Sequence, residues 1–282
     1  MRGGVPAEGG PCPMDKMSVR DWTRFYDSEE AYQLQGLDDE SVLRPYMAVV
    51  AQEMFRSFGP QRVLDVGASR GYLVEAFRHL GCEAFGVELS GHALRQALPE
   101  AKPYLVQATG DGSYLPFADG AFDAVIGLEV IEHLIEPGSL VQEMSRVTRQ
   151  GGIVFITTPV LPFESRLWRY LRIQYNPVHI SVHSQGYWRR LFAHADLGYI
   201  GAQRHIIRKR TELSARNSSQ QHWVLRLLQT KFDGVGARLA QMLTDFAAGS
   251  MVFRKERNDD GATPPAKGTR AEEDIRQGYQ WR

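Results

Sequence analysis

Residues 62–71 read RVLDVGASRG, and this stretch decides the fold. Its first five residues are mostly apolar, which is typical of a buried strand, and the run ends at Asp65 and a glycine. The small residues that follow allow a sharp turn and a close approach of the backbone to a ligand. From Tyr72 to Leu80 the apolar residues lie on one helical face, and Gly81 follows as a stop. The stretch therefore predicts a strand, a tight turn and a helix.

Strand-like and helix-like segments alternate along the chain after this unit. Four more strands are predicted at residues 84–87, 104–106, 122–128 and 153–157. Helices are predicted at residues 42–58, 90–98, 137–149 and 184–195, and Ser90 and Ser184 are the predicted N-caps of the second and the fourth. This alternation is typical of an α/β protein with a parallel sheet and right-handed crossovers.

Acidic residues stand at or just after the ends of three consecutive predicted strands, at Asp65, Glu88 and Asp111. The carboxyl ends of parallel strands meet at one edge of a sheet, where such folds bind ligands. A carboxylate at Glu88 can accept both hydroxyls of a ribose, and one at Asp111 can accept an adenine amino group. Three acids suit a nucleoside that carries a positive charge and suit a pyrophosphate poorly. Capping of the following helices explains one acid comfortably and three less well.

The chain resembles the class I S-adenosylmethionine-dependent methyltransferases. The resemblance rests on residues 63–71, 86–90, 110–111, 115–117, 122–123, 129–134 (EVIEHL) and 151–159 (GGIVFITTP), in the order of the family. It is strong from about Arg62 to Pro159 and reaches Arg254 weakly. At Ser69 the family usually has glycine, so the backbone of this chain is less free at that position.

This resemblance implies a Rossmann-like α/β fold with a mostly parallel, seven-stranded sheet, helices on both faces and helical lid segments. Residues 199–207 and 250–254 are the candidates for the final antiparallel pair. The implied cofactor is S-adenosyl-L-methionine, with its methionine part at the glycine-rich turn, its ribose at Glu88 and its adenine at Asp111. The expected cofactor-binding residues are Asp65, Gly67, Ala68, Ser69, Gly71, Glu88, Leu89, Asp111, Gly112 and Glu129.

His133 is the candidate catalytic residue. If the chain turns helical after the fourth strand, Glu129, Glu132 and His133 share one face near the transferred methyl group. Three roles compete for the imidazole: a general base, a metal ligand together with the two glutamates, and a structural brace. A metal site would need a further histidine, from His179 or His183. We predict no metal.

Composition divides the chain into three parts. Residues 1–17 are rich in Gly and Pro and residues 256–282 are polar, so we expect both to be disordered. Residues 18–255 form the expected methyltransferase domain. Within it we predict a helical N-terminal lid at residues 18–60, lid and acceptor segments at 160–195, and a helical insertion at 220–246.

Charge and cysteine content narrow the range of partners. The chain has 282 residues with 33 basic and 33 acidic side chains, and a balance of zero argues against the nucleic-acid backbone as its main partner. Two cysteines, Cys12 and Cys82, cannot form a disulfide framework or, alone, a structural zinc site. We see neither a membrane span nor a secretory signal, and expect a cytoplasmic monomer or homodimer.

The function we expect is O-methylation of a small-molecule or glycan-like acceptor. Aromatic residues outside the predicted sheet, Trp22, Phe25, Tyr26, Tyr32, Phe163, Trp168, Tyr170 and Tyr175, are candidates to contact that acceptor or to pack on the domain. Two alternatives stay open. One is a metal-assisted RNA 2′-O-methyltransferase, which the EVIEH motif also resembles. The other is a non-catalytic cofactor-binding or scaffold relative, against which the intact acids and glycines argue.

Overall fold

The computed structural model of the chain describes residues 40–108, 114–161, 179–203 and 248–256, together with Ser18, Asp21, Arg24, Phe25, Asp27 and Ser28. The expected helical insertion at 220–246 lies outside these residues. So do the two tails, apart from Glu256, and most of the predicted lid and acceptor segments at 18–39 and 162–178. None of the helices in the described part of the chain has the length and apolar character that a bilayer crossing requires.

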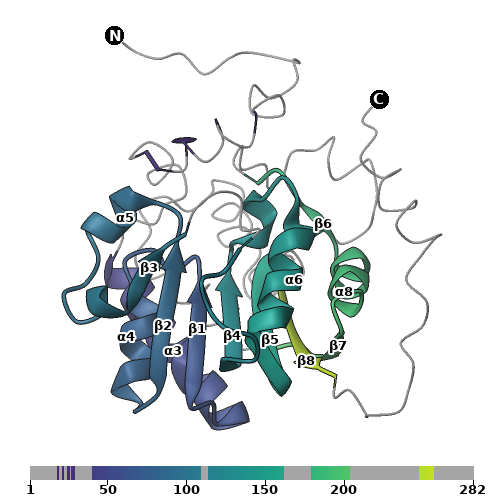
Figure 1. Cartoon of the computed structure of the whole chain (residues 1–282), viewed down its shortest axis with the longest axis horizontal. Coiled ribbons are helices and arrows are strands. Elements are labelled where there is room, and N and C mark those ends of the chain that lie inside the picture. The colour runs from purple at the N-terminus through teal and green to yellow at the C-terminus, as the bar shows by residue number, and fades with distance from the viewer. Residues whose placement is uncertain are drawn as a thin grey trace, which may run out of the picture.

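A single mixed sheet organises the domain, with strand order β3-β2-β1-β4-β5-β8-β7 (Figure 1). Its strands are β1 (Arg62–Val66), β2 (Glu83–Glu88), β3 (Leu105–Gln107), β4 (Phe122–Leu128), β5 (Thr148–Leu161), β7 (Leu197–Gly201) and β8 (Ala248–Lys255). Strands β1 to β5 are parallel, and β8 runs antiparallel to both β5 and β7. A two-residue strand, β6 (His183–Ser184), pairs with the end of β5 outside this row. The predicted fold, with its antiparallel final pair, is confirmed.

Helices cover both faces of the sheet, as expected. Helices α3 (Glu40–Phe58) and α4 (Tyr72–His79) lie behind the sheet in Figure 1, whereas α6 (Pro137–Val147) and α8 (Gln185–Ala193) lie in front of it. Each face has its own apolar core: Val50, Met54 and Phe77 pack on one side, and Leu140, Met144 and Trp188 on the other. Since β1 and β4 are buried between the two cores, they are nearly continuous apolar runs.

Helix α3 covers the sheet, and this differs from the lid that we expected over residues 18–60. Tyr46, Val50, Ala51 and Met54 are buried and join the core that includes α4. At the start of α3, the Arg44 guanidinium donates to both carboxylate oxygens of Glu75 in α4, at 2.6 and 3.0 Å. An amphipathic helix is stabilised when its apolar stripe packs against another element, and the stripe of α3 packs against α4.

Three smaller expectations need correction. Helix α5 is shorter than predicted and spans Gly91–Arg95, with a 3-10 turn η2 at Lys102–Tyr104 before β3. Helix α6 ends at Val147 and β5 begins at once at Thr148, so the glycines at 151 and 152 lie inside the strand. They accommodate an irregularity in the β4–β5 pairing, because a Cβ at Gly152 would stand 2.8 Å from the Arg149 carbonyl oxygen. Strand β7 starts at Leu197 rather than at Tyr199.

Candidate active site

The glycine-rich turn after β1 is tied to the neighbouring strand. The backbone N–H groups of Gly67 and Ala68 both donate to the Val87 carbonyl oxygen, at 2.8 and 2.9 Å. Gly67 and Gly71 have φ of 76° and 87°, in the left-handed region that glycine tolerates best. Ser69 has φ of 51°, so the position where the family usually has glycine does take a conformation that favours glycine.

Glu88, at the end of β2, holds this turn with its side chain. One carboxylate oxygen accepts a hydrogen bond from the Ser69 N–H at 2.7 Å, and the other accepts one from the Ser90 N–H at 2.8 Å. Ser90 is also the N-cap of α5, as predicted, because its hydroxyl accepts from the Ala93 N–H at 3.2 Å. Glu88 therefore connects the turn after β1 with the helix after β2.

Asp65 lies beside this arrangement and is only 5% exposed. Burial, and then the nearby carboxylate of Glu88, raise the pKa of Asp65 well above its ordinary value. Burial also raises the pKa of Glu88, although the N–H groups of Ser90, Ser69 and Leu89 act in the opposite direction. The buried carboxylate of Asp65 and the half-buried carboxylate of Glu88 favour the approach of a cationic group, which would stabilise both charges.

The remaining expected cofactor residues divide into two groups. Leu89 follows Glu88 at the start of the loop to α5 and is half-buried. Asp111 and Gly112 lie outside the described residues.

Asp27 contacts α5 although the sequence did not predict it there. Its Oδ1 accepts a hydrogen bond from the His92 N–H in the first turn of α5, at 3.1 Å. A contact between residues so far apart in the sequence leaves no local signal.

The chain does not become α-helical after β4, contrary to the helix expected over Glu129, Glu132 and His133. Glu129 takes φ of 55°, and its N–H donates to the Thr157 carbonyl oxygen of β5 at 2.8 Å. A single 3-10 turn, η3, then spans Ile131–His133. The three side chains that were expected on one helical face therefore lie on an irregular segment, and Glu132 and His133 are both buried.

His133, Glu132 and His179 form a cluster. Ligand atoms of the three side chains lie within 4.8 Å of one another, and the two imidazole rings are 4.8 Å apart, edge to face. The His133 Nε2 is 3.9 Å from a carboxylate oxygen of Glu132. Two hydrogen bonds from Ser181 place the His179 segment here, one to the Glu132 carbonyl oxygen and one to that of Leu134, at 2.8 and 2.7 Å.

The structure thus distinguishes the two candidate histidines. His179 lies beside His133, whereas His183 stacks on Tyr187 with the ring centroids 3.9 Å apart. One carboxylate and two imidazoles form a donor set that fits Zn²⁺ or Mn²⁺. The same groups can also hold and orient a neutral imidazole that accepts a proton.

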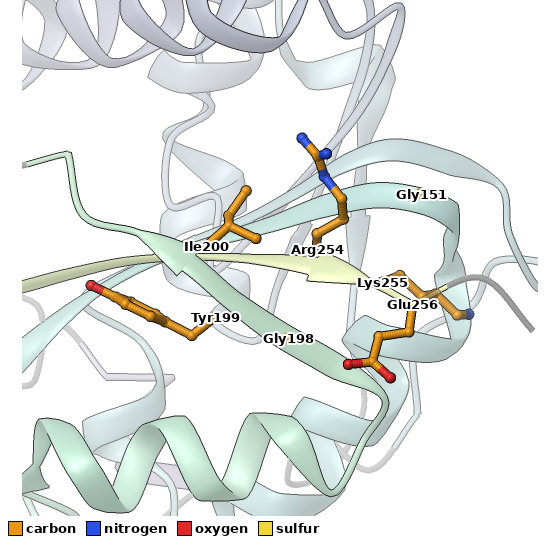
Figure 2. Close-up of a pocket in the computed structure, with 7 residues that line it drawn as sticks. All are labelled: Gly151, Gly198, Tyr199, Ile200, Arg254, Lys255 and Glu256. Carbon is orange, nitrogen blue, oxygen red and sulfur yellow. The ribbon is translucent and has the colours of Figure 1, made fainter.

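A surface pocket lies elsewhere, between β7 and the end of β8 (Figure 2). It is lined by Gly151, Gly198, Tyr199, Ile200, Arg254, Lys255 and Glu256. Gly151 lies near the amino end of β5, whereas Thr157, which bonds Glu129, lies further along the same strand. At 3.3 Å per residue, the strand between these two residues is about 20 Å long. The pocket is therefore remote from the acidic strand ends.

A match to a protein family covers the glycine-rich turn together with Asp65 and Glu88. Residues 64–156 match a family described as "Methyltransferase domain". This part of the chain is a methyltransferase domain. The match begins within β1 and ends within β5, so it contains every described residue of the expected cofactor site.

Two curated relatives illustrate the likeness of this methyltransferase domain to other sequences. The chain is 38% identical over 118 residues to an uncharacterized methyltransferase of Mycobacterium sp. (strain KMS), which covers 40% of this chain and 46% of the relative. It is 34% identical over 103 residues to a ubiquinone biosynthesis O-methyltransferase of Albidiferax ferrireducens, covering 35% of this chain and 41% of the relative. The chain thus spans less than half the length of either relative.

Solved structures agree on the fold of the methyltransferase domain. Geranyl diphosphate C-methyltransferase from Streptomyces coelicolor A3(2) superposes with a TM-score of 0.55 at 17% identity, over 85% of this chain and 97% of that one. That structure holds Mg²⁺, geranyl diphosphate and S-adenosyl-L-homocysteine. At this level of identity the likeness shows the fold alone.

Proposed function

We propose that the chain is an S-adenosylmethionine-dependent methyltransferase that methylates an oxygen atom of a small-molecule or glycan-like acceptor. The observation that carries the cofactor is the pair of carboxylates, Asp65 and Glu88, beside a turn with two left-handed glycines. The superposed methyltransferase that binds S-adenosyl-L-homocysteine supports the same cofactor.

Each side chain has a separate role in holding the cofactor. Asp65 faces the positively charged methionine end, because its own buried charge is stabilised by a cation. Glu88 accepts from the ribose hydroxyls with the lone pairs that its bonds to Ser69 and Ser90 leave open. Asp111 and Gly112 contact the adenine, and the turn from Gly67 to Gly71 lies close to the methionine part.

The reaction needs alignment more than it needs acid–base chemistry. When bound, S-adenosylmethionine supplies a methyl group that its sulfonium has already activated. The protein holds the acceptor oxygen in line with that methyl group and excludes water. A hydroxyl acceptor loses a proton, and His133 is the residue that we propose accepts it, with Glu132 and His179 fixing the orientation of its ring.

Oxygen as the acceptor atom rests on two supports. The EVIEH segment resembles O-methyltransferases of quinone and sugar pathways, and one relative is named as a ubiquinone biosynthesis O-methyltransferase. A buried histidine near the strand ends suits removal of a hydroxyl proton.

The size of the acceptor has a separate support, because the neutral net charge of the chain favours a small acceptor over RNA.

The cluster of Glu132, His133 and His179 favours one second candidate, a metal-assisted 2′-O-methyltransferase acting on RNA. In that case the three side chains would hold a divalent cation, which would bind the acceptor hydroxyl and lower its pKa. Chelation separates the two candidates, because a proton acceptor works without a metal.

Transfer of a labelled methyl group tests the proposal. The purified chain is incubated with methyl-labelled S-adenosylmethionine and two pools from the source cell, one of small molecules and one of short RNA. We expect label in a small-molecule product. Base should release it as volatile methanol if the product is a methyl ester, and hot hydriodic acid should release it as methyl iodide if the product is a methyl ether. Label only in RNA, abolished by a chelator, would favour the second candidate, and no label in either pool would favour a non-catalytic relative.

A further inference from the structure

The short loop between β2 and α5 begins directly after Glu88 and is held by separate parts of the chain. Glu88 itself accepts a hydrogen bond from the Ser90 N–H at 2.8 Å. From the end of β3, the side-chain amide of Gln107 donates to the Leu89 carbonyl oxygen at 3.3 Å. Because the loop continues from the residue that we assign to the ribose, contacts that fix the loop also fix how Glu88 is presented.

Asp27 adds a contact from the N-terminal part of the chain. Its Oδ1 accepts from the His92 N–H at 3.1 Å. Asp27 lies in a turn in which the N–H and the hydroxyl of Ser28 both donate to the Phe25 carbonyl oxygen, at 2.9 and 2.6 Å. A carboxylate is favoured at the start of a helix, where N–H groups lack partners within the helix. The bond therefore docks the N-terminal turn on the loop that follows Glu88.

Gly91 leaves the space that this docking needs. A Cβ at Gly91 would stand 3.2 Å from Oδ1 of Asp27, 3.1 Å from Nε2 of Gln107 and 3.3 Å from Nη1 of Arg95. Gly91 does not have a positive φ, so the absence of a side chain is what it contributes here. Polar side chains from the N-terminal turn, β3 and α5 thus converge over one glycine, beside the ribose residue.

We propose that Asp27 is a positioning residue for the cofactor: it docks the N-terminal turn on the loop after β2, and this docking and the binding of the ribose at Glu88 stabilise each other. The inference rests on the proposed function, since it presumes that Glu88 accepts from the ribose hydroxyls. Asp27 itself makes no contact with the cofactor. Because such coupling is reciprocal, docking strengthens cofactor binding by the same factor by which the cofactor strengthens docking.

Binding of S-adenosylhomocysteine, followed by isothermal titration, tests the first half of this coupling. Asp27 is exposed, so its bond competes with water and its loss should have a moderate effect. Asp27→Ala should bind S-adenosylhomocysteine roughly three- to tenfold more weakly than the parent, mainly through faster dissociation. Asp27→Asn keeps an oxygen that accepts from the His92 N–H, so it should bind within about twofold of the parent.

Asp21→Ala is the matched control. Asp21 is a second carboxylate of the N-terminal part of the chain, and its hydrogen bonds to described residues are both with Ser18. Removal of this carboxylate changes the net charge as Asp27→Ala does but leaves the contact with His92 in place. Asp21→Ala should therefore keep the parent's affinity for S-adenosylhomocysteine.

Proteolysis tests the second half of the coupling, from the side of the N-terminal turn. Trypsin cleaves after arginine, and Arg20 and Arg24 lie just before this turn in the sequence. Saturating S-adenosylhomocysteine should slow cleavage at these sites in the parent by roughly three- to tenfold, because cleavage follows the undocked population. In Asp27→Ala, cleavage should be equally fast with and without the ligand. Mass spectrometry of the fragments distinguishes local undocking from unfolding, which would expose sites along the whole chain.

The outcomes separate this inference from the proposed function. A parent that does not bind S-adenosylhomocysteine contradicts both. A parent that binds, with a folded Asp27→Ala that binds equally well, overturns the inference alone. Equal weakening in Asp27→Ala and Asp21→Ala also overturns it, because the effect would then come from net charge. Cleavage after Arg20 and Arg24 that the ligand does not slow in the parent overturns the coupling.

Discussion

The carboxylate of Glu88 accepts a hydrogen bond from the backbone N–H of Ser69 at 2.7 Å. This bond joins the end of β2 to the middle of the glycine-rich turn, at the residue with φ of 51°. A charge-assisted bond of this kind offsets the cost of a left-handed serine, which is about 1–2 kcal/mol. Glu88 therefore shapes the turn in addition to the role that we propose for it at the ribose.

Substitution of Gly67 should disrupt the turn through both conformation and contact. A Cβ at Gly67, where φ is 76°, would clash with Cγ2 of Val130 in the segment that leads to His133. Gly67→Ala should therefore destabilise the fold by more than the roughly 1–2 kcal/mol expected for left-handed strain alone. Unfolding in denaturant measures the loss.

Gly81→Ala is the matched control for this substitution. Gly81 has φ of 84°, but a Cβ there meets no atom within 4 Å. It should cost the strain only, and S-adenosylhomocysteine affinity should be unchanged. Equal losses of stability in the two variants would show that the contact with Val130 is unimportant.

Asp65→Asn should stabilise the ligand-free fold at neutral pH. The pKa of Asp65 is raised in the folded protein, so between its ordinary value of 3.8 and the raised value the folded state binds the proton more tightly than the unfolded state. Stability therefore falls as pH rises through that window. Removal of the charge should raise Tm at pH 7, by roughly 2–4 °C for each kcal/mol recovered, and the gain should shrink as pH falls.

Asp123→Asn is the control of opposite sign. Burial acts to raise the pKa of Asp123, but hydrogen bonds from Arg149 and from the N–H groups of Arg62 and Gln61 outweigh it and lower the pKa. Asp123→Asn should therefore lose stability at pH 7.

Ligand binding gives a second measurement on Asp65→Asn, because saturating S-adenosylhomocysteine should raise the Tm of this variant less than it raises the Tm of the parent. A gain at pH 7 that persists unchanged in acid would contradict the assignment of the effect to the charge.

The sequence predicted the strands best where both faces of a strand are buried. The bounds of β1 and β4 agree with the predicted runs, because parallel strands between two helical layers are continuously apolar. The caps at Ser90 and Ser184 were also predicted, since a serine followed by an amphipathic helix is a local signal.

The sequence was less informative where long-range contacts outweigh local preference. The segment after β4 forms a 3-10 turn at Ile131–His133, because the Glu129 N–H bonds to β5 and prevents an immediate α-helix. His179, and not His183, lies beside His133 because Ser181 bonds the carbonyl oxygens of Glu132 and Leu134. These bonds form only in the folded chain and leave no local signal in the sequence. The bonds of Arg146 to Leu115 and Phe117 leave no pattern in the sequence for the same reason.

His133→Ala should lower turnover by roughly 10²–10⁴-fold and leave S-adenosylhomocysteine affinity unchanged, if His133 accepts the acceptor's proton. A chelator should then have no effect. His183→Ala is the control, because its ring stacks on Tyr187 outside the cluster. Turnover and titration calorimetry together measure these effects.

A metal role for the same cluster predicts a different set of results. Turnover would fall with a chelator and recover with Zn²⁺ or Mn²⁺, and His179→Ala and Glu132→Ala would share the defect of His133→Ala. Near-parental turnover in His133→Ala would reject both chemical roles and leave alignment as the whole mechanism.

Titration of the chain with S-adenosylhomocysteine, beside its Glu88→Ala and Glu88→Gln variants, tests the central claim most directly. We expect the parent to bind one equivalent. Glu88→Ala should bind at least roughly tenfold more weakly, because it loses charge-assisted bonds to the ribose as well as its bonds to Ser69 and Ser90. Glu88→Gln should fall between them, since its amide oxygen still accepts. A parent that does not bind, or a folded Glu88→Ala that binds like the parent, would contradict the account.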